Sequence, residues 1–496
     1  MILLLALTAC RDKTRATGTT GIDSGDTQNT GTDSGILPDE GCLDAVSPPL
    51  SGDVCVTAAP CTWSGEQSYE FFAYALDSGG DLDGDGYDEI VAGSLSWDGE
   101  SLSDNGRAVI FSGGQLSSDD TVLGEITGAN HGDYLGSAVA FIPDATGDGL
   151  AELLIGANGV DDGELGEVGA ALLISADLTP IATLLGERAY ARAGSSLSGA
   201  DLDGDGLAEL LIAGELKENV DDNESYAIGR VYVVSGRTDA SWPSALADAD
   251  ASLSGEDDDD GAGVGIAGAD LDGDGYPDLI VGAPYAGYTG RVYVYPGGAG
   301  FSGDLSLADA PIQISGGASY DAFGWAVTGG DLTGDGAAEL VVGAPLDNVT
   351  WGDEGSVTLY GGGADFFETT PAALTTIAGE KDDFQLGTGL DATGDVSGDG
   401  INDLLMGGVS AYSGLATKSG RSYLLHGRAD GWSEITNAAQ SDALLFGAAT
   451  KDYVGRANAA GDVNGDGTAD VVVGSGYANL QGYYDVGQLY LFFGGS

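Results

Sequence analysis

The stretch GGDLDGDGYDEIVAGS, residues 79 to 94, joins a crowded acidic turn to a short β-prone run. Asp81, Asp83, Asp85 and Glu89 occupy positions one, three, five and nine of the turn. Carboxylates this close repel one another unless a cation lies among them. Ca²⁺ takes oxygen ligands at about 2.3–2.6 Å, and a tight loop can direct alternate side chains to one point. The spacing therefore predicts a calcium-binding loop that leads into a strand.

The same nine-residue pattern recurs along the chain. It starts at Asp81, Asp144, Asp201, Asp270, Asp331, Asp395 and Asp462. Positions one and five are always Asp, positions four and six are always Gly, position nine is Asp or Glu, and position three always keeps a side-chain oxygen. A metal ligand must keep an oxygen, whereas an acidic turn that only aids solubility need not. The recurrence therefore favours calcium binding over a merely soluble turn.

The predicted ligands are the side-chain oxygens of positions one, three, five and nine and the backbone carbonyl of position seven. Glycines at positions four and six allow the positive φ angles that such a loop needs. For up to seven Ca²⁺ ions the ligand set is Asp81, Asp83, Asp85, Tyr87, Glu89, Asp144, Thr146, Asp148, Leu150, Glu152, Asp201, Asp203, Asp205, Leu207, Glu209, Asp270, Asp272, Asp274, Tyr276, Asp278, Asp331, Thr333, Asp335, Ala337, Glu339, Asp395, Ser397, Asp399, Ile401, Asp403, Asp462, Asn464, Asp466, Thr468 and Asp470. An EF-hand is excluded because its twelfth position is Glu, and every copy here has an apolar residue there.

Each loop belongs to a longer repeat. The loops start 57 to 69 residues apart, and each repeat but the last contains four short β-prone runs. This pattern predicts an all-β fold, a seven-bladed β-propeller over residues 55–496. The last repeat lacks an outer run, and TWSG at residues 62–65 supplies the missing signal. We expect this N-terminal strand to complete the final blade and to remove an exposed sheet edge.

The segment FGWAVTGGDLTGDGAAELVVGAP, residues 323–345, resembles the FG-GAP repeat of integrin α-subunit propellers and their bacterial relatives. The resemblance extends over nearly all of residues 62–496. It implies a ring of seven blades, calcium loops between the first and second strands of each blade, and a binding role. The signature is weaker in FFAY (71–74), RAG (192–194) and GAG (261–263).

The N-terminal region predicts export. Residues 1–10, MILLLALTAC, resemble a signal peptide with a bacterial lipobox, which implies a lipid anchor on Cys10 in an outer-membrane or cell-surface lipoprotein; an ordinary secretory signal is the alternative. Residues 11–54 form a Thr/Gly/Ser/Asp-rich flexible linker and a cysteine-containing lead-in. A disulfide between Cys55 and Cys61, or between Cys42 and Cys55, is expected in an oxidising compartment.

Charge and loop composition bear on the partner. A net charge of −63 with only 16 Lys and Arg argues against nucleic acid. The connections that vary between repeats are expected on the face opposite the acidic loops, where a protein or carbohydrate ligand would bind. Their aromatic residues are Trp97, Tyr226, Tyr285, Tyr288, Trp351, Tyr412, Tyr477, Tyr483 and Tyr484. Gly-Arg pairs at Arg107, Arg230, Arg291 and Arg421 are expected to serve the scaffold, because four repeats share them.

These features favour a non-catalytic recognition or adhesion module with an unidentified partner. One alternative is a propeller hydrolase or lyase that acts on polysaccharide through paired carboxylates, for which Asp161, Asp162, Glu164 and Glu167 are available. Another is a structural component of the envelope or matrix. His131 and His426 are isolated in the sequence, and nucleophile-elbow, phosphate-loop and zinc-protease motifs are absent from it.

Overall fold

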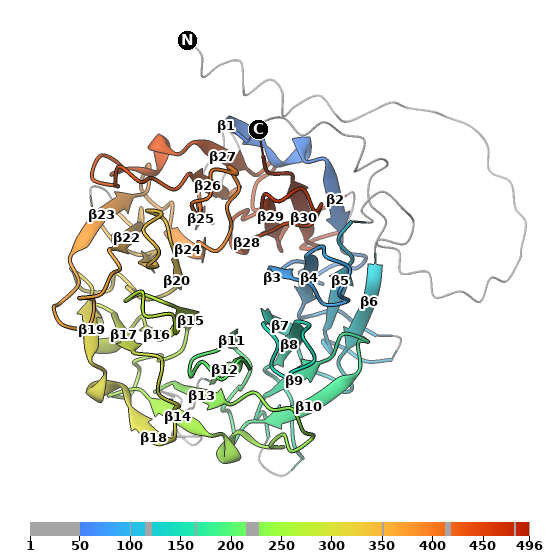
Figure 1. Ribbon diagram of the computed structural model, residues 1–496. Helices are drawn as coiled ribbons and strands as arrows, with labels where there is room; N and C mark the ends of the chain where they lie inside the picture. The colour runs from blue at the N-terminus through green and yellow to red at the C-terminus, as the bar shows by residue number, and fades with distance from the viewer. Residues whose placement is uncertain are drawn as a thin grey trace, which may run out of the picture.

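The computed structural model describes residues 50–99, 101–114, 122–163, 166–214, 228–349, 352–411, 418–480 and 483–495. Their strands form seven sheets arranged in a ring, with the inner strands around a central axis (Figure 1). The fold is a seven-bladed β-propeller, which confirms the predicted fold class. The described helical segments are single 3₁₀ turns, and none of the described residues forms a helix with the length and hydropathy of a membrane span.

Each blade contains four antiparallel strands, ordered from the centre of the ring outward. They are β3 (Ala75–Gly80), β4 (Glu89–Ser94), β5 (Arg107–Phe111) and β6 (Val122–Thr127) in the first blade; β7 (Leu135–Ile142), β8 (Glu152–Ala157), β9 (Ala170–Ile174) and β10 (Pro180–Leu185) in the second; β11 (Ser196–Ala200), β12 (Glu209–Gly214), β13 (Arg230–Val234) and β14 (Ala251–Ser254) in the third; β15 (Gly265–Ala269), β16 (Asp278–Ala283), β17 (Arg291–Tyr295) and β19 (Ile312–Ser315) in the fourth; β20 (Val327–Gly330), β21 (Glu339–Ala344), β22 (Ser356–Tyr360) and β23 (Ala373–Ala378) in the fifth; β24 (Leu386–Asp391), β25 (Leu404–Gly408), β26 (Arg421–Leu425) and β27 (Ala443–Phe446) in the sixth; and β28 (Asn458–Gly461), β29 (Asp470–Ser475), β30 (Gln488–Phe492) and β2 (Cys61–Ser64) in the seventh.

The N-terminal strand closes the ring, as predicted. β2 pairs antiparallel with β30, with Cys61 opposite Leu491 and Ser64 opposite Gln488. Trp63 in β2 is fully buried, and its ring centroid lies 5.1 Å from that of Phe111 in the first blade. The seventh blade is therefore built from both ends of the propeller, and its outer edge packs on the first.

Glycines at the blade junctions explain the FG-GAP signature. A side chain on Gly282 in β16 would place its Cβ 2.0 Å from the carbonyl oxygen of Gly324, which precedes β20 in the next blade. The same contact occurs between the pairs Gly93 and Gly136, Gly156 and Gly194, Gly343 and Gly387, and Gly407 and Gly455. At the two remaining junctions one partner is alanine, Ala213 against Gly263 and Ala73 against Gly474. The signature glycines therefore let adjacent sheets approach each other at backbone distance.

Two further strands, not predicted from the sequence, cover the outer edges of blades. β1 (Gly52–Cys55) pairs parallel with β27 of the sixth blade, and β18 (Gly303–Ser306) pairs parallel with β14 of the third. Each is followed by a 3₁₀ turn, η2 (Val56–Ala58) or η5 (Leu307–Asp309), whose first residue is buried. The turns η3 (Leu246–Asp248) and η6 (Ala438–Gln440) follow single parallel bridges at two more junctions, and η4 (Ala286–Tyr288) follows β16. Apart from η4, which joins the second and third strands of the fourth blade, these segments lead into the outer strand of one blade and cover the edge of the preceding blade.

The cysteines lie in different sheets. Cys55 ends β1 on the sixth blade and is disulfide-bonded, whereas Cys61 begins β2 on the seventh and is a buried thiol. The expected pairing of Cys55 with Cys61 is therefore wrong, because η2 separates the two residues onto neighbouring blades. Cys42 and Cys10 lie outside the described residues.

The four Gly-Arg arginines link adjacent blades. Arg107 in β5 is 1% exposed and donates from Nη2 to Glu70 Oε1 at 2.6 Å, in the connection that arrives from the seventh blade. The equivalent pairs are Arg230 with Glu187, Arg291 with Glu256, and Arg421 with Glu380. Each glutamate comes from the connection that enters the blade from the preceding one. These arginines serve the scaffold, as expected.

Candidate metal centres and the variable face

The seven acidic loops lie between the first and second strands of each blade and share one backbone path. In every loop the glycine at position four has φ between 73° and 80°, and the glycine at position six has φ between 87° and 94°. In the first loop, Asp81 accepts the N–H of Gly84 at 2.7 Å and that of Gly86 at 3.1 Å. These two hydrogen bonds hold the first carboxylate in place. At positions three and five, Asp83 accepts the N–H of Asp85 and Asp85 accepts the N–H of Tyr87, both at 3.1 Å.

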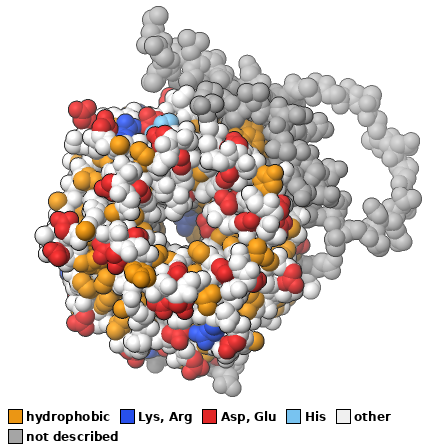
Figure 2. Space-filling model, viewed as in Figure 1, with side chains coloured by type: hydrophobic (Ala, Val, Ile, Leu, Met, Phe, Trp, Pro, Cys, Tyr) orange, Lys and Arg blue, Asp and Glu red, His pale blue; other side chains and the backbone are white. Residues whose placement is uncertain are grey.

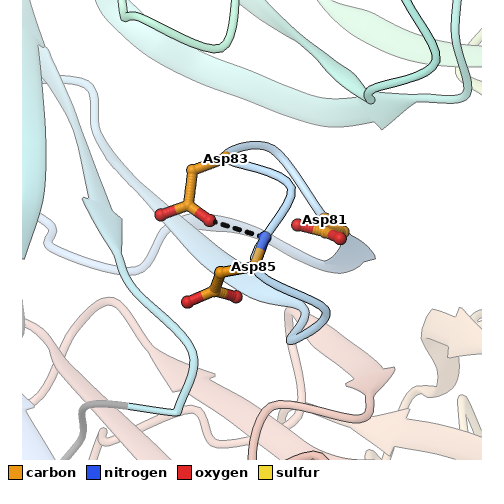
Figure 3. A group of neighbouring side chains, drawn as sticks. All are labelled: Asp81, Asp83 and Asp85. Carbon is orange, nitrogen blue, oxygen red and sulfur yellow. Dashed lines mark hydrogen bonds between the residues drawn. The ribbon is translucent and has the colours of Figure 1, made fainter.

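Three carboxylates of the first loop, those of Asp81, Asp83 and Asp85, lie near one another (Figure 3). Three acidic residues each offer an oxygen within 4.8 Å of the others in four loops. These groups are Asp81 with Asp83 and Asp85, Asp144 with Asp148 and Glu152, Asp201 with Asp203 and Glu209, and Asp270 with Asp272 and Asp278. Two oxygens on opposite sides of a Ca²⁺ ion are about 5 Å apart, so the spacing and the all-oxygen donor set fit this cation.

The last three loops lack such a group among the described residues. In the seventh loop the amide nitrogen of Asn464 donates to Asp466 and Asp470, each at 3.2 Å, while its oxygen accepts the N–H of Asp466. In the fifth loop the hydroxyl of Thr333 donates to Glu339. In these two loops the third-position side chain therefore donates hydrogen bonds to neighbouring acids. That positions three and seven bind a metal stays a prediction.

The acid at position nine is the buried member of each loop. Glu209 is 3% exposed and accepts the N–H of Leu202 at 2.8 Å. Burial, reinforced by the nearby charges of Asp203 and Asp201, raises the pKa of Glu209 to about 7. Burial likewise raises the pKa to about 7 at Glu89, Asp278, Glu339 and Asp470. Without a cation, these carboxyl groups cost folding free energy when they ionise.

Backbone hydrogen bonds connect consecutive loops at six of the seven junctions. The N–H at position eight donates to the carbonyl of the first aspartate in the preceding loop, as from Ala338 to Asp270 at 2.8 Å. The same bond runs from Asp88 to Asp462, Ala151 to Asp81, Ala208 to Asp144, Asn402 to Asp331 and Ala469 to Asp395. At the junction of the third and fourth loops, position eight is Pro277, which has no N–H to donate. The repeat pattern does not indicate this linkage, because position eight varies freely.

The aromatic residues expected on the variable face divide into two groups. Trp97 lies against its own blade, with the Arg107 guanidinium 5.0 Å from its ring centroid, and Tyr477 packs against Phe71, Tyr74 and Tyr453. Tyr285, Tyr288, Tyr483 and Tyr484 are exposed by 50% to 72%. Tyr226, Trp351 and Tyr412 lie outside the described residues. Tyr320, 72% exposed, was missed because it lies in a connection between blades rather than between the second and third strands.

A cavity of about 840 Å³ brings three of these tyrosines together. Tyr285, Tyr288 and Tyr320 line it, with Glu256 and Asp260 on its acidic side. Asp260 accepts the N–H groups of Glu256 and Asp257 at 2.9 and 2.8 Å, and burial raises its pKa. Glu256 accepts from Arg291 and from the hydroxyl of Tyr293. The cavity thus presents exposed aromatic rings beside acids that local hydrogen bonds hold in place.

The candidate catalytic carboxylates lie in a surface hairpin. Asp161 and Glu167 form an antiparallel bridge, Asp161 accepts the N–H of Gly163 at 2.7 Å, and Glu167 lies 3.7 Å from Arg192. Asp162 is exposed, and Glu164 lies outside the described residues. His131 accepts the N–H of Ser103 at 2.9 Å, and His426 follows β26. The Asp161 carboxylate thus accepts a backbone N–H of its own turn, and the Glu167 carboxylate lies beside a basic side chain.

Comparison with known proteins agrees with this architecture. The FG-GAP repeat family matches residues 262–295, 323–360 and 454–492, which lie in the fourth, fifth and seventh blades. Integrin alpha-PS2 of Drosophila melanogaster is 32% identical over 251 residues, covering 47% of this chain and 17% of that protein. Phosphatidylinositol-glycan-specific phospholipase D is 29% identical in Bos taurus over 215 residues, covering 40% of this chain and 25% of the relative. The rat enzyme of that name is 35% identical over 166 residues, covering 32% and 19%.

A ring of four-stranded blades with glycine-lined junctions and an acidic loop in each blade defines a repeat-built β-propeller. More particularly, three of its blades match the FG-GAP repeat family, and its propeller is similar to integrin α-subunits. The chain spans between 17% and 25% of the length of these three relatives.

Proposed function

We propose that this protein is a calcium-stabilised, non-catalytic recognition module at the cell surface, which binds a protein or carbohydrate through its variable face. The observation that carries the proposal is the contrast between the two faces. One face repeats a single loop geometry seven times, whereas the other holds a cavity lined by the exposed Tyr285, Tyr288 and Tyr320. Exposed aromatic rings in a concave site are typical of binding surfaces.

Binding to glycan and envelope-protein arrays tests the recognition role. The full chain in calcium should bind a partner, and replacement of Tyr285, Tyr288 and Tyr320 by alanine should abolish that binding without changing the melting temperature. Tyr484→Ala, an exposed tyrosine of another blade, is the matched control. Binding that survives the triple replacement would contradict the proposed surface.

Calcium is proposed as the ion that the acidic loops hold. The four groups of three oxygens within 4.8 Å support it, as does the burial of the ninth-position acids. Equilibrium dialysis should detect up to seven Ca²⁺ per chain, with tighter binding in the first, third and fourth loops, which carry four carboxylates rather than three. The absence of uptake by the folded protein would refute this part.

Surface anchoring through a lipid on Cys10 completes the proposal. The lipobox-like sequence supports it, and the disulfide at Cys55 is in keeping with an oxidising compartment. Cys10→Ser should move the protein from the membrane to the soluble fraction of expressing cells. Retention of the variant on membranes would exclude lipid on Cys10 as the anchor.

A catalytic role is the second candidate, because several relatives are named as phospholipases. Incubation with phosphatidylinositol-glycan and with acidic polysaccharides, followed by product analysis, distinguishes the two. We expect no turnover. Product formation that disappears in Glu256→Gln or Asp260→Asn would replace the recognition role with hydrolysis in the tyrosine cavity.

A further inference from the structure

The central channel opens on the variable face through a ring with one residue from each blade. The seven inner strands surround this channel, and Figure 2 shows a hollow in the middle of the propeller with a basic side chain inside it. A cavity of about 480 Å³ lies at the start of these strands. The residue that follows the signature glycine, or Ala73 in the first blade, lines it in every blade: Tyr74, Ser137, Ser195, Val264, Trp325, Thr388 and Arg456. We call these residues the mouth ring.

The residues two positions further along each inner strand are much more alike than those of the mouth ring. Two residues further along each strand lie Leu76, Val139, Leu197, Ile266, Val327, Leu390 and Asn458, and all of them line both this cavity and a second one of about 580 Å³ below it. Six of the seven are aliphatic, which suits a packed scaffold. The mouth ring instead holds aromatic, hydroxyl, aliphatic and basic side chains at equivalent places. A scaffold position would repeat its residue, so the variety points to a ligand.

Arg456 is the exceptional member of the ring. It donates from Nη2 to the hydroxyl of Tyr74 at 2.6 Å and stacks 4.2 Å above that ring. Each of the other eight arginines in the described ranges lies within 4.0 Å of a carboxylate, and Arg456 has no such ion pair there. The chain has 79 acidic residues against 16 basic ones, so an arginine without an acid is conspicuous. A guanidinium carries five N–H donors, and its planar fork matches a carboxylate.

The remaining ring members specify what carries that carboxylate. The ring of Trp325 lines the cavity and is a flat apolar surface on which the C–H face of a sugar can stack, while the ring of Tyr74 carries Arg456. The hydroxyls of Ser195 and Thr388 donate to backbone carbonyls of Ala213 and Gly407, both at 3.3 Å, which leaves their oxygens as acceptors for ligand hydroxyls. A cavity of this volume is within the usual range for small ligands.

We propose that the mouth ring binds an acidic sugar, a uronate unit of a polysaccharide, with its carboxylate on Arg456 and its ring against Trp325. This inference rests on the proposed recognition role of the variable face and adds to that face a second site with its own ligand class. The acidic residues that line the lower cavity are Asp77, Asp88, Asp391 and Asp462, and none of them lines the upper cavity, which holds the mouth ring. They are therefore separated from the carboxylate position.

Titration calorimetry on the full chain in calcium tests the proposal, with galacturonate trisaccharide as the acidic probe, maltotriose as the neutral one and triglutamate as an acidic peptide. The galacturonate probe should bind. Arg456→Met and Trp325→Ala should each weaken it by about tenfold to hundredfold, and Arg456→Lys, which keeps the charge without the fork, by less. The control Tyr484→Ala, an exposed tyrosine that lines neither cavity, should leave galacturonate binding unchanged. Melting temperatures in calcium identify variants that fail to fold.

The outcomes separate this inference from the function on which it rests. Equal binding of maltotriose, binding of triglutamate in place of galacturonate, or affinity that is indifferent to both Arg456 variants would overturn the mouth-ring proposal. If one of these results is obtained and an array partner still binds and is lost on replacement of the three cavity tyrosines, the recognition role stands and only the uronate site is refuted. If neither the arrays nor the three probes show binding, both fall.

Discussion

Glu209→Gln should change the stability of the propeller in opposite directions with and without calcium. The Glu209 carboxyl is 3% exposed, and burial raises its pKa from 4.5 to about 7. One pKa unit corresponds to about 1.4 kcal/mol, so ionised Glu209 costs the calcium-free fold up to about 3 kcal/mol at pH 8. Glutamine can still accept the N–H of Leu202 but carries no charge. In chelator the variant should therefore be the more stable protein, and in calcium it should be the less stable one because it has lost an anionic ligand.

Urea unfolding followed by tryptophan fluorescence at pH 8, in calcium and in chelator, measures both differences. In chelator the advantage of the variant should shrink as the pH falls toward 5, where the wild-type carboxyl is protonated in the folded state. Asp452→Asn is the matched control. Asp452 is also buried, accepts the N–H of Ala449 at 2.6 Å and has a pKa raised by burial to about 6, but lies outside the loops. Asp452→Asn should change the free energy of unfolding with the same sign in calcium and in chelator. If Glu209→Gln also changes it with the same sign in both solutions, Glu209 is not a metal ligand.

Three further outcomes are expected. Asp205→Ala should lower the melting temperature in calcium and change it little in excess chelator, and equal losses in both would speak against Asp205 as a ligand. In chelator the wild-type free energy of unfolding should fall as the pH rises from about 5 to 8, because the five ninth-position carboxyls with a pKa raised to about 7 bind more protons when folded; calcium should remove most of this slope in urea titrations. Arg107→Met should cost about 3 to 5 kcal/mol in urea, because it leaves the fully buried Glu70 without its cation, and a loss below 1 kcal/mol would show that the pair is dispensable.

The sequence was informative where one physical requirement recurs in every blade. The loop glycines, the strands that follow the loops, such as β16, and the closing strand β2 were all predicted, because a feature that recurs in every repeat stands out from chance variation. The strands β1 and β18 were not, since GDVC and GDLS are too short to show alternation and pair with the edge of a neighbouring blade. The pairing expected for Cys61 was wrong for a similar reason, because proximity along the chain does not reveal that a 3₁₀ turn passes between two sheets.

The candidate site was predicted in part. The spacing of the acids located the loops. The burial of position nine was not predicted, and the hydrogen bonds between loops depend on how the blades are placed side by side. Tyr320 escaped notice because only one class of connection was expected to build the variable face. The mouth ring escaped notice because its residues share no type, and only the ring of inner strands shows that they occupy the same place.

The closure of the ring sets the order in which the protein can mature. Ser64 in β2 and its partner Gln488 in β30 are 424 residues apart in the sequence. At about 5 to 20 residues per second, a ribosome needs roughly 20 to 85 s to travel that distance. During this interval β2 lacks its partner strand β30, so its edge stays unpaired and must be protected from other contacts until the last blade has emerged from the ribosome. Because β2 pairs with β30, the seventh blade and the closed ring can form only after the C-terminal strands have been synthesised.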